Sequence, residues 1–232
     1  MRFIWTLSAA FSAAKSFTAR GATSTLYLVG IEGWGVEVGA YLQNINIINK
    51  AASGRSARSY IREGKWAAVQ ALLVPGDFII LSFGHNDGGS PSTSDRASLY
   101  GESDTATETI THADGVVEVG ATAIISSQTP NNPYEFSSTI VDDPPRFVKY
   151  ARDVAAAKGV PYVDHFAAVI SLYGELGGPT TESYFPRDHT HTNSAGAIQV
   201  AQAFISGLKC PSAEGALALY INSVGQELGA RC

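Results

Sequence analysis

Short apolar runs separated by polar loop residues divide this chain into alternating strands and helices. The runs are rich in Val, Ile and Leu and are continuous, which is typical of strands buried on both faces of a parallel sheet. Five such runs occur, at Leu26–Gly30, Ile45–Asn49, Phe78–Gly84, Thr122–Ser127 and Tyr162–His165. The sequence therefore predicts a parallel sheet of five strands.

Helical patterns lie between these runs and after the last one. Apolar residues recur at helical spacing over Arg58–Leu73, Arg146–Lys158, Phe166–Leu176 and the segment after Asn193. The second pattern predicts a buried face of Phe147, Ala151 and Val154. The last one predicts an apolar stripe of Ile198, Ala201, Ile205 and Leu208. This alternation of strands and helices predicts an α/β domain with right-handed crossovers.

Polar loops follow three of the predicted strands, at Ala52–Ser56, His85–Gly89 and Gln128–Asn132. Ligands of open α/β sheets bind beyond the carboxyl ends of the strands, which is where these loops are expected. The backbone N–H of Gly54 and the side-chain amide of Asn86 could converge there. Together they could stabilise the oxyanion of a tetrahedral intermediate.

Asp188 and His191 form the most informative polar pair. A histidine can act as a general base, and an aspartate three residues earlier can hold its other ring nitrogen. Alone, this spacing also fits a loop histidine beside a solvated carboxylate. The two predicted oxyanion donors favour the catalytic interpretation.

Length and charge limit the class of protein. The chain has 232 residues, of which 45% are hydrophobic, and this is enough for one domain with a continuous core. Its net charge is -5 and only 16% of its residues are charged, so we expect neither nucleic acid nor an anionic membrane as a partner.

The N-terminus has the layout of a secretory signal peptide. Met1-Arg2 is followed by an apolar stretch from Phe3 to Ala14 that is too short to span a bilayer, and then by small and polar residues. We expect residues 1–20 to be the signal peptide of a secreted protein and residues 21–232 to form a single domain. A disordered or helical N-terminal extension is the alternative.

Cys210 and Cys232 are the only cysteines. An even number of cysteines in a secreted chain favours a disulfide over the alternative of two free thiols. The histidines of Asp188–His191 alternate rather than share a helical face, so no metal site is expected. No motif indicates a cofactor.

Seven segments, in order along the chain, resemble the SGNH hydrolases, and specifically the fungal rhamnogalacturonan acetylesterases. They are Tyr27–Gly30, Gly33–Gly35, Ala52–Tyr60, Phe83–Gly89, Ser126–Asn132, Tyr162–His165 and Asp188–Thr192. The resemblance implies a flavodoxin-like three-layer α/β/α sandwich. It also implies that Gly54 and Asn86 form the oxyanion hole, that Asp188 and His191 belong to a catalytic triad, and that Cys210 pairs with Cys232.

The chain departs from this family where the nucleophile should stand. In the family, Gly-Asp-Ser follows the first strand, whereas here Gly30 continues into Ile31-Glu32-Gly33. A crossover helix is also expected before Thr122, yet Glu108–Gly120 shows little helical pattern. The serine nucleophile is therefore absent from the sequence.

Other polar residues could contribute to the site. Ser53 could replace the nucleophile, although a turn serine usually bonds to local backbone. Glu32 stands near the vacant serine position and is expected to be a solvated loop residue. Arg55 and Arg58 could bind the carboxylate of a uronic acid, or pair with residues such as Glu63.

The sequence thus predicts a secreted, monomeric carbohydrate esterase that removes acetyl groups from pectic rhamnogalacturonan. Its partner would be the acetylated polysaccharide. The missing serine leaves two alternatives: an inactive carbohydrate-binding relic, or an incomplete sequence of an active esterase.

Overall fold

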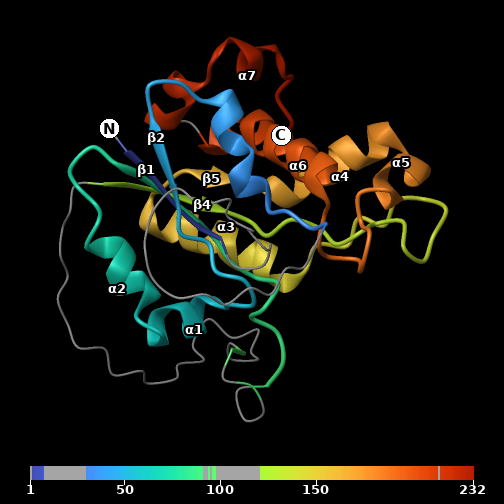
Figure 1. Cartoon of the computed structure of the whole chain (residues 1–232), viewed down its shortest axis with the longest axis horizontal. Coiled ribbons are helices and arrows are strands. Elements are labelled where there is room, and N and C mark those ends of the chain that lie inside the picture. The colour runs from blue at the N-terminus through green and yellow to red at the C-terminus, as the bar shows by residue number, and fades with distance from the viewer. Residues whose placement is uncertain (1, 8–29, 91–93, 95, 98–120, 214) are drawn as a thin grey trace.

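A parallel sheet forms the centre of the molecule (Figure 1). The computed structural model describes residues 2–7, 30–90, 94, 96–97, 121–213 and 215–232. Its strands are β1 (Arg2–Leu7), β2 (Asn46–Asn49), β3 (Phe78–Ser82), β4 (Thr122–Ser126) and β5 (Tyr162–Val163). They are arranged in the order β2-β1-β3-β4-β5, and all neighbours are parallel.

Strands β2 to β5 fall inside four of the predicted apolar runs. The run predicted at Leu26–Gly30 lies outside the described residues, except for Gly30. The position between β2 and β3 is held by Arg2–Leu7, where Arg2 aligns with Asn46 and Phe3 with Phe78. A short apolar run fits both a signal peptide and a buried strand, so its pattern alone does not distinguish them. The signal peptide stays a prediction.

Helices cover both faces of the sheet (Figure 1). The longer ones are α3 (Arg146–Lys158), α4 (His165–Leu176) and α6 (Ser194–Gly207), and the shorter ones are α1 (Ala57–Arg62), α2 (Lys65–Gln70), α5 (Gly178–Glu182) and α7 (Ser223–Glu227). Short 3₁₀ segments are η1 (Trp34–Val36), η2 (Val38–Tyr41), η3 (Pro211–Ala213) and η4 (Ala216–Tyr220). Within the described residues, no helix is long and apolar enough to cross a membrane.

Strand β3 shows why the sheet needs both layers. Successive side chains of a strand point to opposite faces. Ile80 belongs to the core formed with α4 and α6, whereas its neighbour Ile79 packs with Tyr60 of α1 and Val69 of α2. Both isoleucines are buried, so each face of β3 requires its own helical cover.

An aromatic cluster joins η1, α4 and α6 above the sheet. The ring of Trp34 lies 4.5 Å from that of His165 and 4.8 Å from that of Phe204. Burial lowers the pKa of His165 to about 4, and its Nε2 lies 2.9 Å from the carbonyl oxygen of Val200. His165 is thus a neutral core residue.

The predicted helices are found with two corrections. Arg58–Leu73 is not one helix, because Gly64 at φ 72° separates α1 from α2. Helix α3 has the predicted bounds, but its buried residues are Val148 and Ala155, and Val154 is 49% exposed. Sequence periodicity predicted the helix correctly, but not which of its faces packs against β4 and β5.

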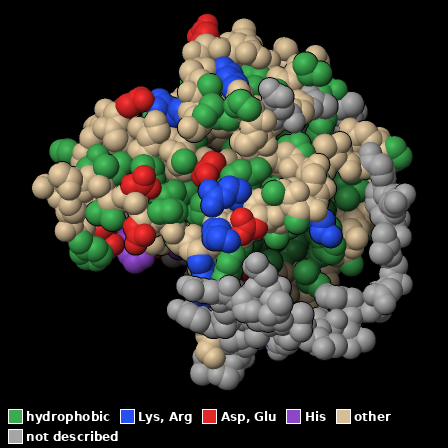
Figure 2. All heavy atoms as spheres, turned by 180° about the vertical axis from the view of Figure 1, so that it is seen from behind, with side chains coloured by type: hydrophobic (Ala, Val, Ile, Leu, Met, Phe, Trp, Pro, Cys, Tyr) green, Lys and Arg blue, Asp and Glu red, His purple; other side chains and the backbone are tan. Residues whose placement is uncertain are grey.

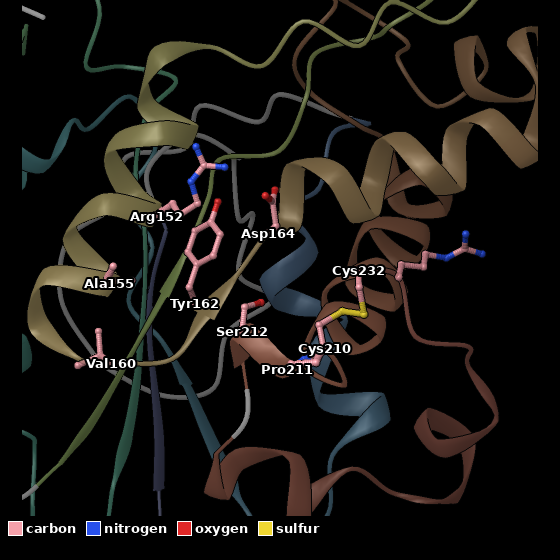
Figure 3. Close-up of a pocket in the computed structure, with 11 residues that line it drawn as sticks. Arg152, Ala155, Val160, Tyr162, Asp164, Cys210, Pro211, Ser212 and Cys232 are labelled. Atoms are coloured by element: carbon pink, nitrogen blue, oxygen red, sulfur yellow. A yellow bond between two sulfur atoms is a disulfide. The ribbon is translucent and has the colours of Figure 1, made fainter.

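A disulfide fixes the C-terminal tail. Cys210 and Cys232 are bonded, with their Cα atoms 5.4 Å apart, which agrees with the predicted pair. Next to it, Arg231 donates to both carboxylate oxygens of Glu175 on α4. The disulfide also borders a cavity of about 480 Å³ between α3, β5 and η3, which includes Arg152 and Tyr162 (Figure 3).

We expect Cys232→Ser to destabilise the folded chain by about 3 kcal/mol, because the open chain gains entropy when a loop of this size is released. The free energy of unfolding in urea, measured with and without reductant, checks this. Reduction should destabilise the wild-type chain and leave the variant unchanged. Equal stability of the two oxidised proteins would contradict the prediction.

Candidate active site

The loops that follow β2 and β3 are tied to each other at the carboxyl edge of the sheet. The backbone N–H of Ala57, at the start of α1, donates to Oδ1 of Asp87 at 3.0 Å. Ser56 caps the same helix, since its Oγ accepts from the N–H of Ser59 at 3.1 Å. Gly54 precedes this cap at φ 67°, a left-handed conformation that glycine adopts without strain. The predicted oxyanion residues Gly54 and Asn86 are therefore on loops that share a direct bond.

Arg96 adds a second link between these loops. Its Nη1 donates to the carbonyl oxygen of Gly54 at 3.0 Å and to Oδ1 of Asn86 at 3.3 Å. Arg58 holds the segment that carries Arg96, because its Nη1 donates to the carbonyl oxygen of Ala97 at 3.1 Å. Arg96 lies outside the segments that carry the family resemblance, so the sequence alone gave no indication of its role.

This contact also determines how the Asn86 amide is oriented. An arginine has only donors, so the Asn86 atom that faces it has to be the oxygen. The amide nitrogen Nδ2 is then directed elsewhere and can donate to another group. The contact with Arg96 thus leaves the Nδ2 group of Asn86 as a hydrogen-bond donor.

His191 and Asp188 lie on a third loop, between α5 and α6, and are hydrogen bonded to each other. Nδ1 of His191 lies 2.8 Å from Oδ2 of Asp188. The other oxygen of Asp188 accepts from the N–H groups of Thr190 and His191, both at 2.8 Å. Partial burial raises the pKa of Asp188, but these hydrogen bonds outweigh it and hold the pKa below its usual value. A carboxylate on Nδ1 leaves Nε2 of His191 to exchange protons with a substrate.

His85 shows that the His191 loop comes close to the Asn86 loop. Burial, followed by the charge of His191, lowers the pKa of His85 to about 4. Its Nε2 lies 3.3 Å from Oγ1 of Thr129, on the loop after β4. His85 is adjacent to Asn86 in the chain and contacts the loop after β4. That loop in turn bonds to the His191 loop, because the N–H of Asn132 donates to the carbonyl oxygen of His189 at 2.6 Å, so the loops after β3, β4 and α5 lie at one edge of the sheet.

Glu32 is not simply a solvated loop residue. Its N–H donates to the carbonyl oxygen of Thr192 at 2.8 Å, and its carboxylate accepts from Oγ of Ser194 at 2.9 Å. The segment that follows Gly30, where the sequence lacks Asp-Ser, therefore lies beside the residues that follow His191. Sequence order gave no sign of this contact, which joins residues far apart in the chain.

Other predicted residues have local partners. Nε of Arg55 donates to Glu63 at 2.8 Å, and its Nη1 donates to the carbonyl oxygen of Ser53 at 2.9 Å. Arg55 thus makes the pairing that was the alternative to uronate binding. In the described part of the chain, no three His, Cys, Asp or Glu side chains are grouped so that they could hold a metal ion.

Gly84→Ala is expected to displace the loop after β4. A Cβ at Gly84, where φ is 151°, would lie 2.1 Å from Oε1 of Gln128, which is only 6% exposed. We expect a loss of about 2 kcal/mol or more in unfolding free energy, measured in urea. Gly88→Ala is the matched control, because a Cβ there has no atom within 4 Å. Equal stability of the two variants would contradict the prediction.

Asp87→Asn tests the buried carboxylate between the loops. Burial raises the pKa of Asp87 from 3.8 to about 6, against the effect of hydrogen bonds from the backbone of Ala57 and Gly84. The folded wild type therefore holds an extra proton between pH 4 and 6 and loses stability as the pH rises through this range. Relative to wild type, the variant should gain about 3 kcal/mol in unfolding free energy between pH 4 and 7. A difference independent of pH would contradict this.

Comparison with known proteins identifies the family. Residues 16–197 match the model of the GDSL-like Lipase/Acylhydrolase family. The chain is 42% identical over 212 residues to a rhamnogalacturonan acetylesterase of Emericella nidulans, which covers 80% of this chain and 85% of that protein.

Solved structures share the fold at lower identity. The protein YXIM of Bacillus subtilis superposes with a TM-score of 0.65 at 18% identity over 90% of this chain, which spans about half (55%) of the YXIM chain. A catalytic mutant of an acetylxylan esterase from Geobacillus stearothermophilus superposes with a TM-score of 0.56 at 16% identity, over 93% of this chain and 97% of that one. These structures support the predicted α/β fold. The chain belongs to the GDSL-like Lipase/Acylhydrolase family, also known as the SGNH hydrolases, as its sequence motifs predicted.

Proposed function

We propose that this protein is a carbohydrate esterase of the SGNH type that acts on acetylated pectic rhamnogalacturonan. The observation that carries the proposal is the 2.8 Å hydrogen bond between His191 and Asp188, on a loop that is bonded to the loop after β4, which also contacts His85 beside Asn86. The similarity to a rhamnogalacturonan acetylesterase supports the substrate class.

In this proposal His191 is the general base and Asp188 its orienting partner. In a chain that carries the Gly-Asp-Ser serine, as members of the family do, the serine oxygen would attack the acetyl carbonyl while Nε2 of His191 takes the serine proton. His191 would then return the proton to the sugar oxygen as the acetyl-serine forms. Water, activated in the same way, would release acetate.

Gly54 and Asn86 would stabilise the oxyanion of each tetrahedral intermediate. The donors would be the Gly54 N–H and the Asn86 Nδ2. Arg96 supports both assignments because it donates to the carbonyl oxygen of Gly54 and to Oδ1 of Asn86, which leaves the N–H groups as the donors. A single such donor contributes about 3 kcal/mol to transition-state stabilisation in serine hydrolases. Arg55 and Arg58 remain candidates for uronate contact, although both already hold protein groups.

The missing nucleophile favours a second candidate function. Gly30 is followed by Ile31-Glu32-Gly33 without Asp-Ser, and Glu32 bonds to Thr192 beside His191. A chain with this sequence would bind the polysaccharide without forming an acetyl-enzyme. An active esterase whose sequence is incomplete here would instead contain the missing loop.

We also propose that the protein is secreted and monomeric. The disulfide between Cys210 and Cys232 supports an oxidising compartment. We assign the domain to the flavodoxin-like type of α/β/α sandwich as part of the same proposal. The predicted signal peptide contains β1, so its removal would take away the strand that pairs with β2 and β3.

The decisive experiment compares acetate release by two chains. We expect the chain as written to release no acetate from acetylated rhamnogalacturonan above background, because removal of a triad serine costs about a million-fold in turnover. Insertion of a Gly-Asp-Ser loop after Val29 should restore release. Acetate is measured after purification from a host without esterase contamination.

Two variants serve as controls. His191→Ala should abolish the restored activity, and Ser53→Ala should leave it unchanged. Rapid acetate release by the chain as written, lost on Ser53→Ala, would show that Ser53 is the nucleophile. No acetate release by the restored chain would contradict the esterase proposal.

A further inference from the structure

A groove of about 250 Å³ lies next to the His191 loop. Its wall is the segment that follows β4, including Pro130, Asn132 and Glu135, and Phe166 of α4 also lines it. Phe136 stands at this groove with 92% of its surface exposed. An exposed aromatic of this size leaves apolar area in contact with water, and its burial by a ligand is favourable.

The groove is continuous with the candidate active site. The N–H of Asn132 donates to the carbonyl oxygen of His189 at 2.6 Å, and Oγ1 of Thr190 donates to Oδ1 of Asn131 at 3.0 Å. The carboxylate of Glu135 lies 3.1 Å from Nδ1 of His189. A ligand bound at Phe136 would thus lie against the loop that carries His191.

The wall of the groove is held in a fixed shape. The N–H of Tyr134 donates to Oδ1 of Asn132 at 3.0 Å, and the N–H of Val141 donates to the carbonyl oxygen of Pro133 at 3.0 Å. Tyr134 itself is buried, and its hydroxyl donates to the carbonyl oxygen of Tyr173 on α4. Phe136 therefore projects from a segment that is bonded to itself and to the core.

The polar lining selects among sugars. Glu135 and Asp143 contribute carboxylates that can accept hydrogen bonds from sugar hydroxyls, and Asn131 and Asn132 contribute amides. No Lys or Arg is among the residues that line the groove. Figure 2 shows that on one face of the molecule several Lys and Arg side chains lie next to Asp and Glu side chains. A uronate in the groove would face the carboxylates of Glu135 and Asp143, which oppose its charge.

We propose that this groove is a subsite for a neutral sugar ring of the polysaccharide, with Phe136 as the platform on which the ring stacks. The inference rests on the proposed carbohydrate substrate. It adds the place on the protein where a neutral sugar of the polysaccharide binds. A pyranose ring has an apolar face of C–H groups that covers an aromatic ring, while its hydroxyls reach the carboxylates and amides.

Binding of the full chain to rhamnogalacturonan oligosaccharides, measured by titration calorimetry, tests this without any need for turnover. We expect Phe136→Ala to weaken binding about tenfold and Phe136→Trp to preserve it. Leu219→Ala is the matched control, because Leu219 is 81% exposed on η4 and belongs to neither the groove nor the candidate site. Phe136 is so exposed that the variants should keep the circular dichroism spectrum of the wild type.

The charge selectivity is tested with Asp143→Asn and with oligosaccharides of uronic acid alone. The uronic acid oligosaccharides should bind the wild type more weakly than rhamnogalacturonan oligosaccharides do. In Asp143→Asn the difference between the two affinities should be smaller. Unchanged rhamnogalacturonan binding by Phe136→Ala would overturn the subsite while leaving the proposed function in place. Absence of binding by the wild type to any acetylated pectic oligosaccharide would overturn both.

Discussion

The hydrogen bond from the Ala57 N–H to the buried carboxylate of Asp87 is the constraint on which the candidate site depends. It joins the start of α1 to the loop after β3, and so fixes Gly54 and Asn86 relative to each other. Burial of this carboxylate disfavours its charged form and raises its pKa to about 6, and the bond from Ala57 offsets part of that effect. Arg96 and the contact between the rings of Tyr60 and Phe83 also join these loops, but Arg96 is exposed to solvent.

The His191 loop is held from two sides by residues distant in the sequence. Asn131 and Asn132 bond to it on one side, and Glu32 bonds to Thr192 and Ser194 on the other. A general base has to be placed within hydrogen-bond reach of the proton it transfers, so this support bears directly on the proposed function. The bonds of Asn131 and Asn132 also join the Phe136 groove to the site. A ligand could therefore span both, as several linked sugars of a polysaccharide would.

Two residues became visible only in the structure. Arg96 follows a Ser-rich loop and Phe136 follows Glu135, and neither belongs to a periodic pattern or a motif. The bond from Arg96 to the Asn86 oxygen and the exposure of Phe136 depend on the three-dimensional arrangement of the chain. The sequence analysis instead chose Arg55 and Arg58, which are close to Gly54 in the chain but donate to Glu63 and Ala97.

The sequence by itself determined the strands from β2 to β5, the bounds of α3, the disulfide pair, the Asp188 and His191 spacing and the family. These features depend on local periodicity or on short motifs, which the order of residues contains. Tertiary structure placed Arg2–Leu7 between β2 and β3, because a short apolar run does not specify its neighbours in a sheet. It also decided the rotation of α3, the orientation of the Asn86 amide and the contact of Glu32 with the His191 loop. Each of these depends on a partner ten or more residues away, and the pattern of one segment does not contain the position of another.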